Sequence, residues 1–173
     1  MTEQERDALL DQIAEKELKM FLDAPDESEG LKQRPEAFKL TRVMAHSAHD
    51  EAFLSSYLRD LTDAAKVGRN FIVEKYGRLQ NILPPLNESP LLAKIASAEP
   101  AWLNEAHKLY PEIIKKGASD KFEDFLRCEL ETLSDKSLEL YGEEVQNALA
   151  EKKNLALARH NWLAQKLGKA PLI

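Results

Sequence analysis

Two glutamates stand among apolar residues, where an uncharged side chain is expected. Glu17 lies four residues after Ile13 and three before Met20, and Glu99 follows Ile95 at the same spacing as Glu17 follows Ile13. At about 100° per residue, both positions face the apolar side of a helix. An ionised carboxylate that is buried alone is costly, so each glutamate needs a cation, a metal or several hydrogen-bond donors, or must be protonated.

The chain supplies several cations that could neutralise these carboxylates, namely Arg42, Arg69, Arg127 and Lys153. One interpretation is therefore a pair of structural ion pairs, or of carboxylates at the boundary of the core that reach solvent. The other is a paired-carboxylate site between two halves of the chain, which would hold a divalent metal, as carboxylate-bearing helical bundles do, or perform acid–base chemistry.

Tyrosine and asparagine side chains recur in both halves and would supply hydrogen bonds to such a site. Tyr57 and Asn70 are thirteen residues apart, and so are Tyr141 and Asn154. The alternative for the asparagines is structural: Asn70 follows Gly68, where an interrupted helix leaves backbone groups to be capped. The candidate ligand-binding residues are Glu17, Arg42, Tyr57, Arg69, Asn70, Glu99, Tyr141 and Asn154.

His46 and His49 lie three residues apart on an expected helix, a spacing compatible with metal ligation. Their counterparts in the second half are Leu130 and Leu133, which favours packing at the edge of the core. The cofactor is unknown from the sequence, with a divalent metal as one candidate. Its candidate ligands are Glu17, Glu99, His46 and His49.

The elements that must position these residues are helices, because apolar residues recur at helical spacing and strand-like alternation is absent. Asp50, Ser89 and Ser134 are expected N-caps, and Pro100 is expected to kink or briefly break its helix. An all-α protein of about eight helices follows. We expect them near residues 3–22, 35–48, 50–61, 69–80, 91–109, 120–132, 135–150 and 152–167.

The two halves of the chain repeat each other. Leu9-Leu10-x-x-Ile13-Ala14-x-x-Glu17 matches Leu91-Leu92-x-x-Ile95-Ala96-x-x-Glu99, and the Tyr and Asn pairs match at an offset two residues longer. We expect a single helical domain over 1–173, in which two related units of three to four helices share one core about a pseudo-two-fold axis. The units are 3–82 and 90–168, joined by the proline-rich linker 83–89.

Composition narrows the classes of function. The chain has 173 residues, a net charge of −6 and one cysteine, Cys128, which excludes an internal disulfide and a zinc ribbon. The acidic balance argues against binding duplex nucleic acid. The acidic start of the chain is unlike a secretory signal, and no apolar run approaches the ~20 residues that span a bilayer. We therefore expect a cytoplasmic protein without a membrane partner.

The segments 56–61 (Ser-Tyr-Leu-Arg-Asp-Leu) and 68–76 (Gly-Arg-Asn-Phe-Ile-Val-Glu-Lys-Tyr) resemble an uncharacterised bacterial family, domain-of-unknown-function family 4125. The likeness spans most of the chain. One departure is Lys152-Lys153-Asn154, where the family has Gly-Arg-Asn. The resemblance implies a bacterial, intracellular, helical protein and supplies no activity, substrate or cofactor.

Three hypotheses for function follow from the residues. The first is a binding module for a small molecule or a protein, with a polar cleft between the two units. The second is a metal-dependent or acid–base enzyme that uses Glu17 and Glu99, with His46 or His49 assisting. The third is a helical partner subunit, which would expose an apolar patch large enough to be an interface.

Overall fold

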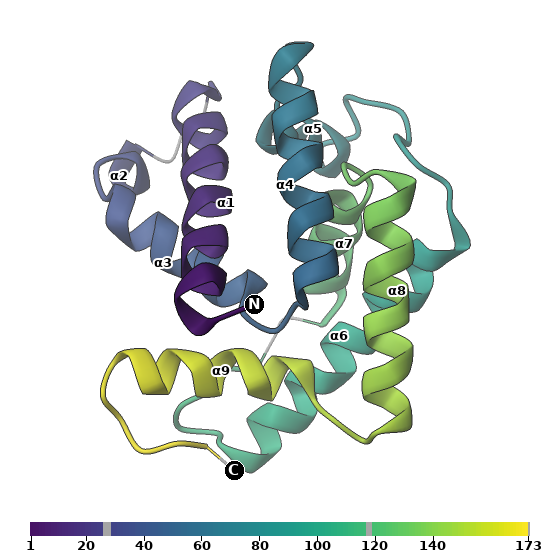
Figure 1. Ribbon diagram of the computed structural model, residues 1–173. Helices are drawn as coiled ribbons and strands as arrows, with labels where there is room; N and C mark the ends of the chain where they lie inside the picture. Colours follow the sequence, from purple (N-terminus) through teal and green to yellow (C-terminus); the bar gives the residue numbers. More distant parts are fainter. Residues whose placement is uncertain (26–28, 117–118, 173) are drawn as a thin grey trace.

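The computed structural model describes residues 1–25, 29–116 and 119–172, and every regular element in these ranges is a helix (Figure 1). Eight of the helices are long, and α2 is a single turn of four residues. The predicted all-α class is confirmed. The helices are α1 (Glu3–Asp23), α2 (Glu29–Lys32), α3 (Pro35–His46), α4 (Glu51–Lys66), α5 (Phe71–Leu79), α6 (Pro90–Leu109), α7 (Ser119–Leu130), α8 (Asp135–Ala150) and α9 (Leu155–Lys166).

Side-chain caps fix where the central helices begin. The carboxylate of Asp50 accepts a hydrogen bond from the third backbone N–H of α4, and the hydroxyl of Ser134 does the same for α8. Ser89 caps α6, and Pro90 occupies its first position, where a missing N–H costs nothing. These starts agree with the predicted ones because a cap is a local signal.

Pro100 does not break its helix. The structure shows α6 as one helix from Pro90 to Leu109, so the short break that the sequence allowed is absent. Proline removes one backbone hydrogen bond, but Glu99 and Trp102 on either side of it are both buried. We attribute the continuity to this burial, which holds the turns before and after Pro100 on the same core.

Each half of the chain is built around its first long helix. In the first half, α1 packs against α3, α4 and α5, and in the second half α6 packs against α7, α8 and α9. The helices correspond in position as well as in order: α3 begins at Pro35 and α7 at Ser119, while α4 begins at Glu51 and α8 at Asp135. Both pairs are 84 residues apart (119 − 35 and 135 − 51).

The contacts between the halves are also reciprocal. Helix α5 of the first half packs against α7 of the second, and α9 of the second packs against α3 of the first. Helices α4 and α8 pack against each other, and Figure 1 shows them side by side, while α9 runs beneath α1 and α3. Exchanging the halves converts the α5–α7 contact into the α9–α3 contact and leaves the α4–α8 contact unchanged, which is the arrangement expected about a pseudo-two-fold axis.

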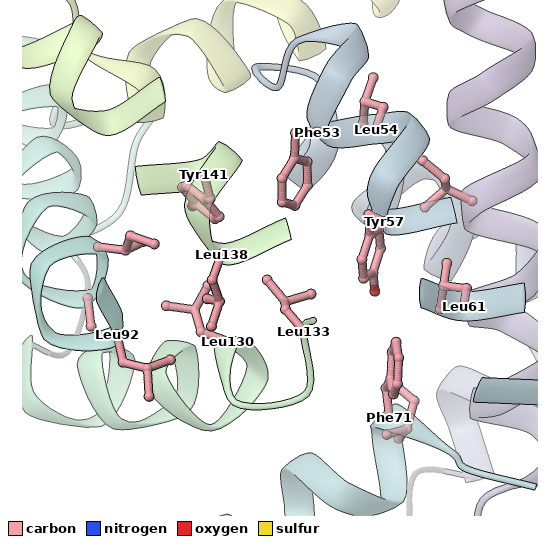
Figure 2. Close-up of a cluster of buried hydrophobic side chains, with 14 of the residues drawn as sticks. Phe53, Leu54, Tyr57, Leu61, Phe71, Leu92, Leu130, Leu133, Leu138 and Tyr141 are labelled. Atoms are coloured by element: carbon pink, nitrogen blue, oxygen red, sulfur yellow. The ribbon is translucent and has the colours of Figure 1, made fainter. Parts of the chain in front are cut away.

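One hydrophobic core extends across both halves. Leu54 on α4 and Leu138 on α8 occupy matching positions, and both are fully buried. Figure 2 shows the side chains of the two halves facing each other, with Phe53 between Tyr57 and Tyr141. The Phe53 and Tyr141 rings meet edge to face, with centroids 5.4 Å apart. Aromatic contacts of this kind therefore join the halves as well as filling the core.

In the ranges that the structure describes, none of the helices combines the length and the apolar character needed to cross a membrane.

Candidate functional site

Glu17 lies on the buried face of α1, where three side chains surround its carboxylate. Tyr57 Oη donates a hydrogen bond to Oε2 at 2.8 Å, and Arg42 Nη2 donates to the same oxygen at 2.8 Å. Nε2 of His46 lies 3.1 Å from Oε1. Helix α3 carries Arg42 and His46 on one face, four residues apart, and α4 carries Tyr57. The buried charge therefore has the cation and the donors that its position requires.

Arg42 also reaches into the second half of the chain. Its Nη2 lies 2.8 Å from Oε1 of Glu129, on α7, and Nζ of Lys75 lies 3.7 Å from the same oxygen. Lys75 is buried on α5, with its ammonium group 4.4 Å from the centroid of the Phe125 ring. Glu129 thus joins two cations of the first half to the second half.

Glu99 has a cluster of its own on the buried face of α6. Arg159 binds both carboxylate oxygens, through Nη1 at 2.6 Å and Nη2 at 2.9 Å, in the bidentate geometry that favours a strong pair. Tyr141 Oη donates to Oε1 at 2.8 Å. Arg159 also donates from Nε to the carbonyl oxygen of Ala45, on α3, at 3.0 Å. This cluster therefore contacts the other half too.

The two clusters share part of their composition. Each contains a buried glutamate, a tyrosine that donates to it and a basic residue at a matching position, Lys75 in the first and Arg159 in the second. Arg42 and His46 have no polar counterpart, because Leu126 and Leu130 occupy the matching positions. The site as a whole is therefore asymmetric.

Neighbouring charged side chains decide whether the glutamates and tyrosines of the two clusters are ionised. Burial by itself raises the pKa of a carboxyl group, but Arg42 and His46 outweigh it and hold the pKa of Glu17 well below its ordinary value. Arg159 lowers the pKa of Glu99 against the same effect of burial. Burial, with the adjacent glutamate, raises the pKa of both Tyr57 and Tyr141. Near neutral pH the glutamates are ionised and the phenols keep their protons.

His49 lies in the turn between α3 and α4 and is enclosed by aromatic rings. Its ring stacks on Phe53 with centroids 3.9 Å apart and meets Tyr141 edge to face at 4.6 Å. Nδ1 lies 2.9 Å from Oε1 of Glu144, on α8. Burial lowers the pKa of His49, while Glu144 opposes this in part. The imidazole is therefore neutral at neutral pH.

A cavity with a volume of about 240 Å³ lies between the two halves. The first half contributes α3 and α4 to its wall, and the second contributes α6, α7, α8 and α9. Besides Tyr57 and Glu129, its polar side chains are Arg42, His46, His49, Glu99, Tyr141 and Arg159. Its apolar wall includes Phe53, Phe122, Phe125, Leu126, Leu130 and Leu133. Of the seven predicted ligand-binding or metal-ligating residues other than Arg69, Asn70 and Asn154, six line this cavity. The seventh, Glu17, does not line it but is bonded to three residues that do, Arg42, His46 and Tyr57.

The other three predicted ligand-binding residues lie at helix ends. Asn70 caps α5 and donates from Nδ2 to the carbonyl oxygen of Met20 at 2.8 Å, and Asn154 caps α9 and donates to that of Trp102 at 2.9 Å. Arg69 pairs with Glu74 at 2.8 Å near the surface. The structure thus gives the asparagines the structural role that the sequence left open.

Two of the four predicted metal ligands, Glu17 and His46, are in contact, but no third possible ligand joins them among the described residues. Glu17 and Glu99 each bind an arginine, and His46 and His49 contact different carboxylates. Within residues 1–25, 29–116 and 119–172, no three His, Cys, Asp or Glu side chains are grouped in a way that could hold a metal ion. The metal assignment stays a prediction.

Sequence reasoning missed several residues of these clusters. Arg127 and Lys153 were the cations considered for the second half, whereas Arg159 is the one that binds Glu99. A signal for Arg159 exists, because it lies 84 residues after Lys75, which is a buried basic residue of the first half (159 − 75). Glu129 and Glu144 carry no comparable signal, since their partners lie far away in the sequence.

Comparison with known proteins identifies a family but no characterised relative. No curated protein and no solved structure matches the chain. A family profile described as protein of unknown function (DUF4125) matches residues 7–172, which is nearly the whole chain. The chain therefore belongs to the DUF4125 family, as its Tyr-Leu-Arg-Asp and Gly-Arg-Asn segments predict.

Proposed function

We propose that this protein is a small-molecule-binding module, built from two related units over 3–82 and 90–168 that the linker 83–89 joins into one domain. The ligand occupies the cavity between the units. The observation that carries the proposal is the cavity of about 240 Å³, whose wall combines apolar rings with polar side chains from both halves. Such a combination is typical of ligand sites, in which apolar groups supply contact area and a few polar groups orient the ligand.

The volume of the cavity indicates the size of the ligand. A cavity of roughly 150 Å³ holds benzene, and pockets for drug-sized molecules begin near 300 Å³. At about 240 Å³, the cavity fits a molecule with one ring or two fused rings. A ligand of this size fits between the halves without separating them.

The ionisation of the clusters favours binding over acid–base catalysis. A general base works best with a pKa near the working pH. Both Glu17 and Glu99 have their pKa lowered, and each is already bonded to an arginine and a tyrosine. Ionised carboxylates of this kind orient and neutralise neighbouring groups, so the enzyme hypothesis has less support than the binding hypothesis.

The proposal is tested by filling the cavity. Ala45 borders the cavity, and Ala37 lies exposed on the same helix. Native mass spectrometry of protein purified without chelator detects a retained small molecule or metal, and ligand-observed NMR against a library of one-ring and two-ring compounds detects weak binders. We expect Ala45→Leu to abolish binding and Ala37→Leu to leave it intact.

Two results would overturn the proposal. One is the absence of both a retained molecule and any binder in the library. The other is a ligand that binds Ala45→Leu as well as the parent, because such a ligand occupies a different site. A retained divalent metal that is lost in Glu17→Gln and Glu99→Gln would favour the metal-dependent alternative instead.

A further inference from the structure

The charged side chains at the cavity already neutralise one another. Arg159 is paired with Glu99 in bidentate geometry. Arg42 lies between two carboxylates, with Glu17 and Glu129 each 2.8 Å from its Nη2. No arginine or glutamate among the described residues of the wall is left without an opposite charge.

The hydrogen-bond donors and acceptors of Arg159 and Glu99 are also already bonded within the protein. Nη1, Nη2 and Nε of Arg159 bond to Glu99 and to the carbonyl oxygen of Ala45. Both oxygens of Glu99 accept bonds, since Oε1 also receives the Tyr141 hydroxyl. A charged ligand would have to break one of these pairs or enter without a counter-charge, and both are costly away from water.

His49 adds no charge to the wall. Its Nδ1 contacts Glu144, and its ring is packed between Phe53 and Tyr141. Burial lowers its pKa, so the ring is neutral at neutral pH. Phe122 and Phe125 cover another part of the wall. The space between the halves is therefore lined by rings, by charges that are compensated within the protein and by His46, whose buried Nδ1 has no hydrogen-bond partner among the described residues.

We infer that the ligand of this cavity is an uncharged, mainly apolar molecule, and that the ion pairs Arg159–Glu99 and Arg42–Glu129 exclude anions and cations of the same size. The inference rests on the proposed function, because it assigns a ligand class to the same cavity. Binding here is driven by apolar contact with the rings, and the paired charges act against ionised competitors.

Three probes of one size test this selectivity. Benzyl alcohol is neutral, benzoate is an anion and benzylammonium is a cation, and all three share one ring that fits a cavity of about 240 Å³. We expect benzyl alcohol to bind the parent protein at least about tenfold more tightly than either ion at pH 7.5, because an ion loses its hydration without gaining a counter-charge. Chemical-shift perturbation of the side chains at the cavity gives the three dissociation constants and the location of binding.

A variant that removes one carboxylate at the cavity tests whether the ion pairs set this selectivity. Glu129→Gln leaves Lys75 without its carboxylate and Arg42 with only Glu17. We expect benzoate to bind this variant at least about tenfold more tightly than it binds the parent, while benzyl alcohol changes by less than about threefold. Glu123→Gln is the matched control, since it makes the same change on the exposed face of the same helix. It should leave all three constants unchanged.

The outcomes separate the inference from the proposed function. If benzoate or benzylammonium binds the parent at the cavity as tightly as benzyl alcohol, the inference is wrong and the cavity is still a binding site. If benzoate gains nothing in Glu129→Gln, paired charges do not set the selectivity, and the inference again fails. If no probe perturbs the cavity and the library yields no binder, the proposed function fails and the inference with it. Selectivity for benzyl alcohol that Glu129→Gln alters and Glu123→Gln does not would support both.

Discussion

Single side chains decide whether the two buried glutamates stabilise or destabilise the fold. Each carboxylate is almost fully enclosed, and each receives one bond from a tyrosine and others from an arginine. A buried ion pair is often no more stabilising than an apolar replacement, but losing one partner of the pair is strongly destabilising. Replacing a tyrosine by phenylalanine removes one hydrogen-bond donor to the glutamate without changing the net charge of the cluster.

We therefore expect Tyr57→Phe and Tyr141→Phe each to lower the free energy of unfolding by about 1.5–3 kcal/mol, the usual value of a hydrogen bond to a charged group. The Phe side chain keeps the ring contacts with Phe53, so the loss reflects the bond to Glu17 or Glu99. Urea denaturation followed by circular dichroism measures the change. A loss below about 0.5 kcal/mol in either variant would show that water replaces the phenol.

The pKa of His49 predicts how stability depends on pH. His49 binds a proton in the unfolded chain near pH 6.5 but only at lower pH in the folded protein, because burial lowers its pKa. Between these values the unfolded state binds more protons, so the free energy of unfolding falls as the pH drops from 7 to 5. The glutamates, whose pKa is lowered, add a further loss only below about pH 4.5.

His49→Asn should remove part of this dependence between pH 7 and 5, since its amide can still bond to Glu144 but does not titrate. His160, whose pKa burial also lowers, contributes with the same sign, so His160→Asn is the control that measures its share. Urea denaturation at several pH values gives the slopes. A slope unchanged in His49→Asn would mean that other groups dominate the acid sensitivity.

At the scale of the helices, the two halves carry different residues at the left-handed backbone position that follows α4 and α8. Gly68 follows α4 with φ +74°, and Lys152 follows α8 with φ 57°. The left-handed region suits glycine and costs other residues about 1–2 kcal/mol. Glycine occupies this position in the first half, and lysine occupies it in the second.

We expect Lys152→Gly to raise the free energy of unfolding by about 0.5–1 kcal/mol, because the relieved strain exceeds the extra flexibility of glycine in the unfolded chain. Gly68→Lys should lower it by a similar amount, since open space surrounds Gly68 and only the backbone resists. Denaturation of the two variants beside the parent measures both. A Lys152→Gly variant no more stable than the parent would contradict this account.

The helices were predictable largely because their signals are local. Asp50 and Ser134 mark the starts of α4 and α8, and apolar spacing identifies the buried face that carries Glu17. The partners of the buried charges were predictable only in part. Arg42 was a candidate for Glu17, but Arg159 comes from a helix 60 residues away from Glu99, and no local pattern connects them.

At the scale of the whole molecule, reciprocal bonds connect the halves at the starts of the central helices. Asp60 accepts a hydrogen bond from the backbone N–H of Ser134 at 3.1 Å, and Glu144 accepts one from that of Asp50 at 2.8 Å. Each carboxylate thus holds the capping residue of the opposite half. Together with the shared core and the Glu129 ion pairs, these bonds make separate unfolding of one half unfavourable.

We therefore expect the two halves to unfold in one cooperative transition. Leu138→Ala opens a cavity where α8 meets α4 and should cost about 2–5 kcal/mol. Native-state hydrogen exchange should then show an equal loss of protection for the slowest amides of α1 and of α6, although α1 belongs to the other half. Loss of protection that is confined to α6 and α8 would mean that the halves unfold independently. The cavity between the two halves would then open without global unfolding. An equal loss would instead mean that a ligand bound between the halves stabilises the entire chain, because the cavity exists only while both halves are folded.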